Sequence, residues 1–139
     1  MIQYSGIPYS ILRTTQFHNF VLLLIKNFAI DNTSIIVPQG LKFQSIDIKD
    51  VADILVELTE ENPQGKIPDV GGPQILDIDE LTEIYLVSRG KENIKIESQY
   101  VGGDLYDLFR KGINICPENT KGKFTWKEFL SSNQEWKID

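Results

Sequence analysis

The segment Tyr9-Ser-Ile-Leu-Arg-Thr-Thr-Gln-Phe-His-Asn-Phe-Val-Leu-Leu-Leu-Ile25 decides the fold class of this chain. Its first five residues, 9–13, form a short β-prone run that predicts a buried strand. From Phe17 the apolar residues recur at the three- and four-residue spacing of a core-facing helix, for which Thr14 or Thr15 offers an N-cap. A strand that passes directly into a helix is the building unit of α/β proteins.

The same alternation continues to the end of the chain. Short β-prone runs are separated by amphipathic stretches, and a Thr-x-x-Glu capping box at Thr125 begins a last helix. Gly71-Gly72-Pro73 is expected to be a flexible turn, and Asp47 and Asp50 to be N-terminal carboxylates of a helix rather than catalytic groups. The predicted strands are 35–37, 42–46, 66–70 and 93–97, and the predicted helices are 51–58, 81–89 and 104–111. The order predicts one α/β domain over residues 1–139, too short for a complete doubly wound sheet.

The composition excludes several classes of function. A net charge of −6, from 14 basic and 20 acidic residues, disfavours nucleic acid as a partner. The longest apolar run, 20–25, is too short to cross a bilayer, so we expect no membrane association. Cys116 is the only cysteine, which excludes an internal disulfide, indicates a reducing compartment such as the cytoplasm and predicts a small buried hydrophobe.

Motifs for catalysis and phosphate binding are also missing. The sequence contains neither a G-x-G-x-x-G loop nor a P-loop. It also lacks a Tyr-x-x-x-Lys pair, since Tyr9, Tyr85 and Tyr106 are each followed four residues later by arginine. His18 is the only histidine, so a histidine-based metal site is excluded and no metal is expected. We therefore assign no catalytic residue, and for His18 both a hydrogen-bonded core position and a ligand contact stay open.

Residues 5–20, Ser5-Gly-Ile-Pro-Tyr-Ser-Ile-Leu-Arg-Thr-Thr-Gln-Phe-His-Asn-Phe20, carry a recognisable pattern. They resemble a segment of the NmrA-like, NAD(P)H-binding atypical short-chain dehydrogenases, which are often described as sugar-nucleotide epimerase-like proteins. Three further segments are similar to that family in the same order: Ile46-Asp-Ile-Lys-Asp-Val-Ala-Asp53, Pro68-Asp-Val-Gly-Gly-Pro-Gln-Ile-Leu76, and the tail from Phe109 to Leu130.

The resemblance implies a partial Rossmann-like fold. It begins past the middle of the family's proteins, so the chain is expected to be the C-terminal half of a doubly wound parallel sheet with a small substrate-side α/β subdomain. The glycine-rich N-terminal half would be absent. Carried over by motif, the nicotinamide end of NAD(P) would be bound by Thr14, Thr15, Gln16 and Phe17. The substrate pocket would be lined by His18 and Phe20.

The expected function is that of a substrate- and nicotinamide-facing part of an oxidoreductase-like protein that is not catalytic alone. NAD(P) is implied by the resemblance, but its binding to this chain is expected to be weak or absent, because most dinucleotide affinity comes from the phosphate and adenosine sites. The alternative is a regulatory or protein-interaction module derived from a dehydrogenase. In either case we expect a homo-oligomer or a companion chain that supplies the missing half, since strands such as 10–12 and 35–37 would leave uncharged sheet edges open.

Overall fold

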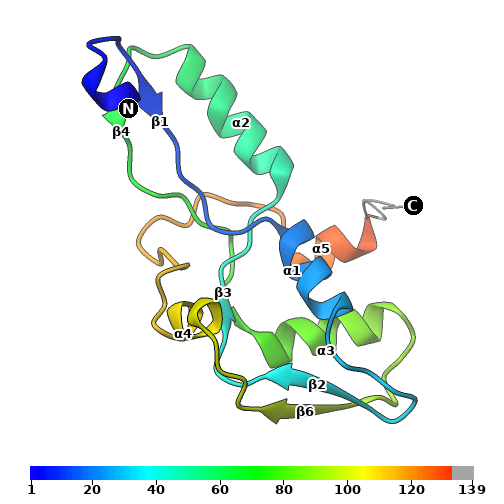
Figure 1. Ribbon diagram of the computed structural model, residues 1–139. Coiled ribbons are helices and arrows are strands. Elements are labelled where there is room, and N and C mark those ends of the chain that lie inside the picture. Colours follow the sequence, from blue (N-terminus) through cyan, green and yellow to red (C-terminus); the bar gives the residue numbers. More distant parts are fainter. Residues whose placement is uncertain (133–139) are drawn as a thin grey trace.

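A computed structural model describes residues 1–132 of the chain. Helices and short strands alternate along it, which confirms the α/β class (Figure 1). In chain order the elements are the 3-10 helix η1 (Ile2–Tyr4), β1 (Ser10–Ile11), α1 (His18–Lys26), β2 (Ser34–Pro38), β3 (Lys42–Phe43), α2 (Ile48–Thr59), β4 (Gly65–Lys66), β5 (Leu76–Asp77), α3 (Ile78–Ser88), β6 (Lys95–Gln99), α4 (Asp104–Arg110) and α5 (Trp126–Ser131).

The strands form three separate two-stranded sheets within the described residues. β1 pairs with β4 and β2 pairs with β6 in parallel, while β3 and β5 are antiparallel. Two isolated parallel bridges, Thr14 with Val70 and Phe17 with Ile46, continue the β1 segment toward α1. Figure 1 shows β1, β4 and α2 at one end of the molecule, β2, β6 and α3 at the other, and β3 between them. The residues that join β1 to α1 therefore run through the middle of the molecule.

The hydrophobic core consists of a large and a small cluster. The large cluster gathers side chains from α1, α3, α5 and the β2 and β3 strands, with Val21, Ile25, Val37, Phe43 and Trp126 among its most buried members. The small cluster holds the region formed by β1, β4 and α2, and its buried members are Ile46, Val51 and Val70. Within residues 1–132, none of the helices has both the length and the apolar character needed to cross a bilayer.

Helix α1 begins where the spacing predicts, but not with the expected cap. Its N-cap is Phe17, which makes no side-chain capping hydrogen bond, so the expectation of Thr14 or Thr15 is wrong. The hydroxyl of Thr15 is engaged elsewhere in the structure, and the backbone of the cap residue pairs with Ile46 instead. The other predicted caps agree with the structure: Asp47 accepts from the Lys49 N–H, and Thr125 forms its capping box.

The strand predicted at 35–37 forms the centre of β2, yet it is not an open edge. β6 pairs along one side of it, while on the other side Ile30 bridges to Ile35 and the Ile36 N–H donates to the Ala29 carbonyl at 2.9 Å. β1 and β6 each keep one side that pairs with no described strand. Open edges therefore include 10–11, as expected, and 95–99, which the sequence did not suggest; β3, β4 and β5 likewise pair with a described strand on one side only.

Gly71 and Gly72 make a close packing contact rather than a flexible turn. Neither has a positive φ angle. A Cβ atom added to Gly72 would lie 1.7 Å from the Ser45 carbonyl oxygen, and one added to Gly71 would lie 2.3 Å from the Gln44 amide nitrogen. The Gly72 N–H donates to the Gln44 carbonyl at 3.1 Å, which holds the two segments at this distance. Gly72 is glycine because the backbone of Ser45 crosses there, and Gly71 is glycine because the buried side chains of Gln44 and Cys116 fill the space that a Cβ would need.

Gly72→Ala should therefore destabilise the chain by about 3 kcal/mol, the upper range for overpacking, because the obstructing atom is backbone and cannot rotate away. Gly102→Ala is the matched control, since its added Cβ would meet only the Tyr100 ring at 3.7 Å. Urea unfolding followed by circular dichroism gives both values. Equal and small losses of stability in the two variants would contradict the close crossing.

Candidate functional site

The segment from Thr14 to His18 is held on both sides by backbone hydrogen bonds. On one side the Thr15 N–H donates to the Val70 carbonyl at 3.0 Å. On the other side the Ile46 N–H donates to the Gln16 carbonyl, and the His18 N–H donates to the Ile46 carbonyl, both at 3.0 Å. These contacts fix the direction in which each side chain of the segment leaves the backbone.

Thr15 and Gln16 differ in how their side chains are satisfied. Thr15 is buried, and its hydroxyl donates to the Gln44 carbonyl at 2.5 Å. The Oε1 atom of Gln16 is shielded from solvent and has no hydrogen-bond partner among residues 1–132. A shielded amide oxygen without a donor carries a desolvation cost, which an N–H or O–H group of a ligand would relieve once the side chain turns this oxygen toward the surface.

Phe17 and Phe20 expose part of their rings. Each side chain is 38% exposed, although both follow the apolar spacing of α1. The face that α1 buries is instead made by His18, Val21, Leu22 and Ile25. The apolar stripe predicted from the sequence is therefore rotated, and two of its aromatic rings lie at the surface near the candidate site.

His18 is a core residue whose two ring nitrogens are both hydrogen-bonded within the chain. It is 1% exposed, and its ring lies 5.3 Å from the Phe129 ring and 5.9 Å from the Trp126 ring, centroid to centroid. Nε2 is 2.9 Å from the Phe124 carbonyl, and Nδ1 is 2.7 Å from the Ser45 hydroxyl. Because a carbonyl can only accept, Nε2 carries the proton and Nδ1 accepts from Ser45. The recess around this ring has no room for a water molecule.

The pKa of His18 is lowered below its usual value of 6.5. Burial is the largest cause, because the charged imidazolium would lose its hydration. The Phe124 carbonyl and the carboxylates of Asp47 and Asp50 act in the opposite direction but do not outweigh burial. His18 is therefore neutral near pH 7 and joins α1 to the segment that leads into α5.

Two buried polar side chains that sequence reasoning did not select complete this region. Gln44 is fully buried; its amide nitrogen donates to the Gly72 carbonyl at 3.1 Å and the Cys116 carbonyl at 3.3 Å, and its Oε1 accepts from the Cys116 N–H at 2.8 Å. Asp50 accepts the N–H groups of Lys123 and Phe124 at 2.8 and 3.0 Å, so it anchors a distant loop besides opening α2. A glutamine within a β-prone run was the only available signal for Gln44.

Cys116 is buried, as the sequence predicts, and it lies beside Gln44. Burial raises the pKa of its thiol, and the nearby carboxylates of Glu118 and Asp69 raise it further. A thiol with a raised pKa forms little of the reactive thiolate. Across residues 1–132 there is also no group of three or more His, Cys, Asp or Glu side chains arranged so that it could hold a metal ion.

The residues present fit only one end of a nicotinamide dinucleotide. The Oε1 of Gln16, once turned toward the surface, can accept from an amide donor, and the partly exposed rings of Phe17 and Phe20 fit an apolar ring system. The phosphates, by contrast, need N–H groups from a glycine-rich loop, which the sequence lacks. The site is thus at most a half-site for such a ligand.

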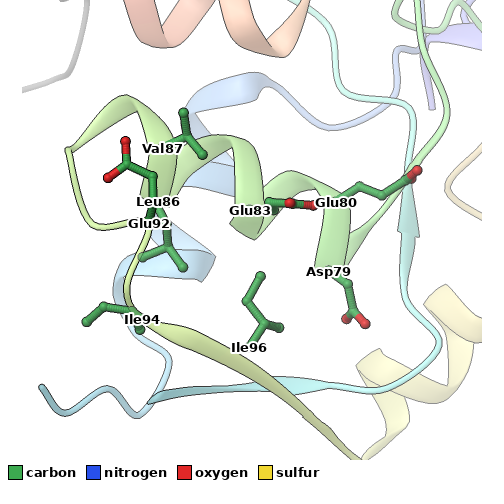
Figure 2. A pocket seen from close by; sticks show the side chains of 8 residues that line it. All are labelled: Asp79, Glu80, Glu83, Leu86, Val87, Glu92, Ile94 and Ile96. Carbon is green, nitrogen blue, oxygen red and sulfur yellow. The ribbon is translucent and has the colours of Figure 1, made fainter. Parts of the chain in front are cut away.

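A larger cavity lies away from this segment. It has a volume of about 440 Å³ and is formed between α3 and β6 (Figure 2). None of Thr14, Thr15, Gln16, Phe17, His18 and Phe20 lines it. Its chemistry is therefore separate from that of the candidate site.

Comparison with known proteins shows the fold. No protein-family model matches the sequence, and no curated protein matches it. A mutant UDP-glucuronic acid 4-epimerase from Bacillus cereus, in complex with UDP-4-deoxy-4-fluoro-glucuronic acid and NAD, is 14% identical with a TM-score of 0.56; the match covers 92% of this chain and 44% of that one. RMD from Pseudomonas aeruginosa, complexed with NADPH, is 13% identical with a TM-score of 0.53, over 91% of this chain and 47% of that one.

The chain thus has a partial Rossmann-like α/β fold, and it spans less than half the length of either solved structure. This confirms the predicted fold class. At these identities the likeness concerns the fold alone, so the assignments of Thr14, Thr15, Gln16 and Phe17 to a cofactor and of His18 and Phe20 to a substrate stay predictions.

The environment of His18 predicts a specific pH dependence of stability. In the unfolded chain its pKa is near 6.5, whereas in the native state it is lower, so the unfolded state binds more protons as the pH falls below 6.5. The stabilising contribution of the neutral His18 ring should be fully present above that pH. The free energy of unfolding should then fall by up to about 1.4 kcal/mol per pH unit as the pH drops toward the native pKa.

His18→Gln removes this titration, and no other histidine is present to replace it. Urea unfolding of the native chain and the variant between pH 5 and 8 compares their slopes rather than their absolute stabilities. Ser45→Ala is the control, because it weakens a contact of the ring but keeps the titrating group. An unchanged slope in His18→Gln would show that the native ring titrates as it does in the unfolded chain.

Proposed function

We propose that this chain is the substrate- and nicotinamide-facing, C-terminal part of an NmrA-like, NAD(P)H-binding oxidoreductase, and that it is not catalytic alone. The observation that carries the proposal is the fold match, which covers more than nine tenths of this chain but less than half of two chains solved with NAD or NADPH. The four motifs between Ser5 and Leu130 support the same assignment.

Within this proposal the junction between β1 and α1 contacts the nicotinamide. Gln16 Oε1 accepts from the carboxamide N–H₂ of the cofactor, which would satisfy an atom that has no partner among residues 1–132. The exposed part of Phe17 packs against the ring, while Thr14 and Thr15 position the segment through Val70 and Gln44. A nicotinamide bound there would supply hydride transfer.

The substrate side of the proposal uses Phe20 and His18 in different ways. Phe20 offers a partly exposed ring to a small-molecule substrate, whose identity stays open. His18 has both nitrogens engaged with Ser45 and Phe124, so its contribution is to fix the start of α1 behind the pocket wall. A neutral, immobilised imidazole suits that supporting role.

The partner in this proposal covers the region formed by β1, β4 and α2. β1 has an open edge there, and several large apolar residues are exposed. They are Ile2, Ile7, Leu55 and Val56, at 59%, 66%, 47% and 59% exposure. We propose that a second copy or a companion chain packs on this region and that the phosphate-binding residues come from outside this sequence. With one buried cysteine, the assembly would suit the cytoplasm.

The same exposed region favours a second candidate function, a regulatory or protein-interaction module derived from a dehydrogenase. In that case the apolar surface of α2 binds a partner and no nucleotide is needed. The two functions differ in whether the segment from Thr14 to Phe17 contacts a nicotinamide.

Saturation-transfer NMR with NADH at millimolar concentration tests the nicotinamide assignment. Magnetisation should pass mainly to the nicotinamide protons and weakly to the adenine protons, because only the nicotinamide end has contacts. Gln16→Leu should reduce the nicotinamide signal, whereas Gln39→Leu, in the exposed turn after β2, should not. An adenine-dominated transfer, no transfer at all, or a low-micromolar dissociation constant in calorimetry would refute the half-site.

The proposed packing on the β1–β4–α2 region predicts the oligomeric state. At micromolar concentration the chain should elute in light scattering as a species larger than 15.9 kDa. Leu55→Lys with Val56→Lys should shift it to the monomer, while Leu105→Lys with Leu108→Lys, at comparably exposed sites on α4, should not. A strictly monomeric native chain would contradict self-association and would leave the companion chain as the remaining form of the proposal.

A further inference from the structure

The cavity between α3 and β6 has an apolar floor that is open to solvent. Its floor is formed by Leu86 of α3, by Ile94 just before β6 and by Ile96 within β6, and Val87 of α3 also lines the cavity. In Figure 2 the Ile96 side chain points from the strand into the space below the helix. A groove of about 440 Å³ is large enough to take several side chains.

Carboxylates surround this apolar floor. Asp79, Glu80, Glu83 and Glu92 all line the groove, and none of them forms an ion pair with a described residue. Asp79 accepts from the Ser98 hydroxyl and Glu80 from the Asp77 N–H, whereas Glu83 and Glu92 are exposed. The groove therefore combines an apolar surface with a strongly negative rim.

The strand that forms the lower wall of the groove can accept another strand. The Lys95 N–H donates to the Thr33 carbonyl and the Gln39 N–H donates to the Gln99 carbonyl, so the odd-numbered residues of β6 face β2. In a parallel ladder the alternate residues, Ile96 and Ser98, then direct their N–H and C=O groups outward. Among the described residues no strand pairs with that side.

The helix and the strand edge have matching periods. Asp79 and Glu83 are one turn apart on α3, which places them about 6 Å apart along the helix axis. Side chains on one face of a strand recur about every 6.6 Å. A strand added along β6 would thus bring alternate side chains opposite Asp79, then Glu83, then the apolar Val87.

From this geometry we propose that the groove binds an extended, basic segment of a partner protein, which adds as a strand to the outer edge of β6. The segment has lysine or arginine at two alternate positions and a large aliphatic residue at the next one. The cations lie against Asp79 and Glu83, and the aliphatic side chain packs on Ile96 and Val87. This binding is independent of any nucleotide, because the groove shares no residue with the site at Thr14 to Phe20.

Fluorescence anisotropy with three labelled peptides tests this proposal on the full chain. The probe alternates lysine and threonine over four positions and continues with isoleucine and threonine. One comparison peptide has glutamate in place of lysine, and the other carries N-methyl groups on the backbone amides that would pair with β6. Only the first peptide should bind, and its affinity should fall with added salt.

Glu83→Lys with Glu92→Lys should weaken binding of the basic peptide at least tenfold. Glu57→Lys with Glu61→Lys, at exposed positions on α2 and just after it, is the matched control because both pairs raise the net charge equally, from −6 to −2. The control should change the affinity less than twofold. Hydrogen exchange should show that the amides of Ile96 and Ser98 become protected when the peptide binds.

Four outcomes would overturn the proposal. Equal loss of binding in both charge-reversed variants would show a general attraction to the acidic chain. Equal binding of the N-methylated peptide, or unchanged exchange at Ile96 and Ser98, would exclude strand addition. No binding of the basic peptide at millimolar concentration would exclude the site. Thermal unfolding of each variant establishes that the compared proteins are folded.

Discussion

The close crossing of Gly72 and Ser45 is the constraint on which the rest of the structure depends. Four stretches of chain that are distant in sequence meet there: the β1–α1 junction, residues 44–46, residues 70–72 and the loop around Cys116. The Gln44 side chain donates to the Gly72 carbonyl and accepts from the Cys116 N–H, and the Thr15 hydroxyl donates to the backbone carbonyl of Gln44. Because the crossing leaves no space for a side chain, small changes there displace the candidate site, both clusters of the core and the start of α5 together.

The elements and fold class could be predicted from the sequence because they depend on local patterns. The periodicity of α1, the Asp47 cap and the Thr125 capping box each require only a few neighbouring residues. The cap of α1 could not be predicted, because Thr15 is drawn to the carbonyl of Gln44, which is remote in the sequence. The glycine pair was misinterpreted for a similar reason: a sequence shows that a side chain is missing but not which backbone approaches.

The sequence proposed the candidate site but could not predict how its side chains are oriented. The resemblance placed the candidate site at Thr14 to Phe20. In the structure Thr15 and His18 are buried, whereas Phe17 and Phe20 are partly exposed. His18 faces inward because α1 is rotated about its axis relative to the stripe read from the apolar residues, which leaves Phe17 and Phe20 partly in solvent. The orientation of a helix depends on its tertiary neighbours, here Trp126 and Phe129, and no local pattern encodes it.

The pairing of the strands has a consequence for how the chain folds. Ser10 pairs with Gly65 and Ser34 with Lys95, so the named strands of the described residues all pair with partners that are distant in sequence, and the local antiparallel contact beside β2 is limited to the single bridge from Ile30 to Ile35. Folding must close long loops before these pairs stabilise it, which slows the reaction compared with helical proteins of the same size. On the ribosome, β1 and β2 emerge well before their partners are synthesised. Until then their apolar residues are exposed to solvent and can aggregate. A chaperone that shields the segment from β1 to β2 would therefore raise the yield of folded protein.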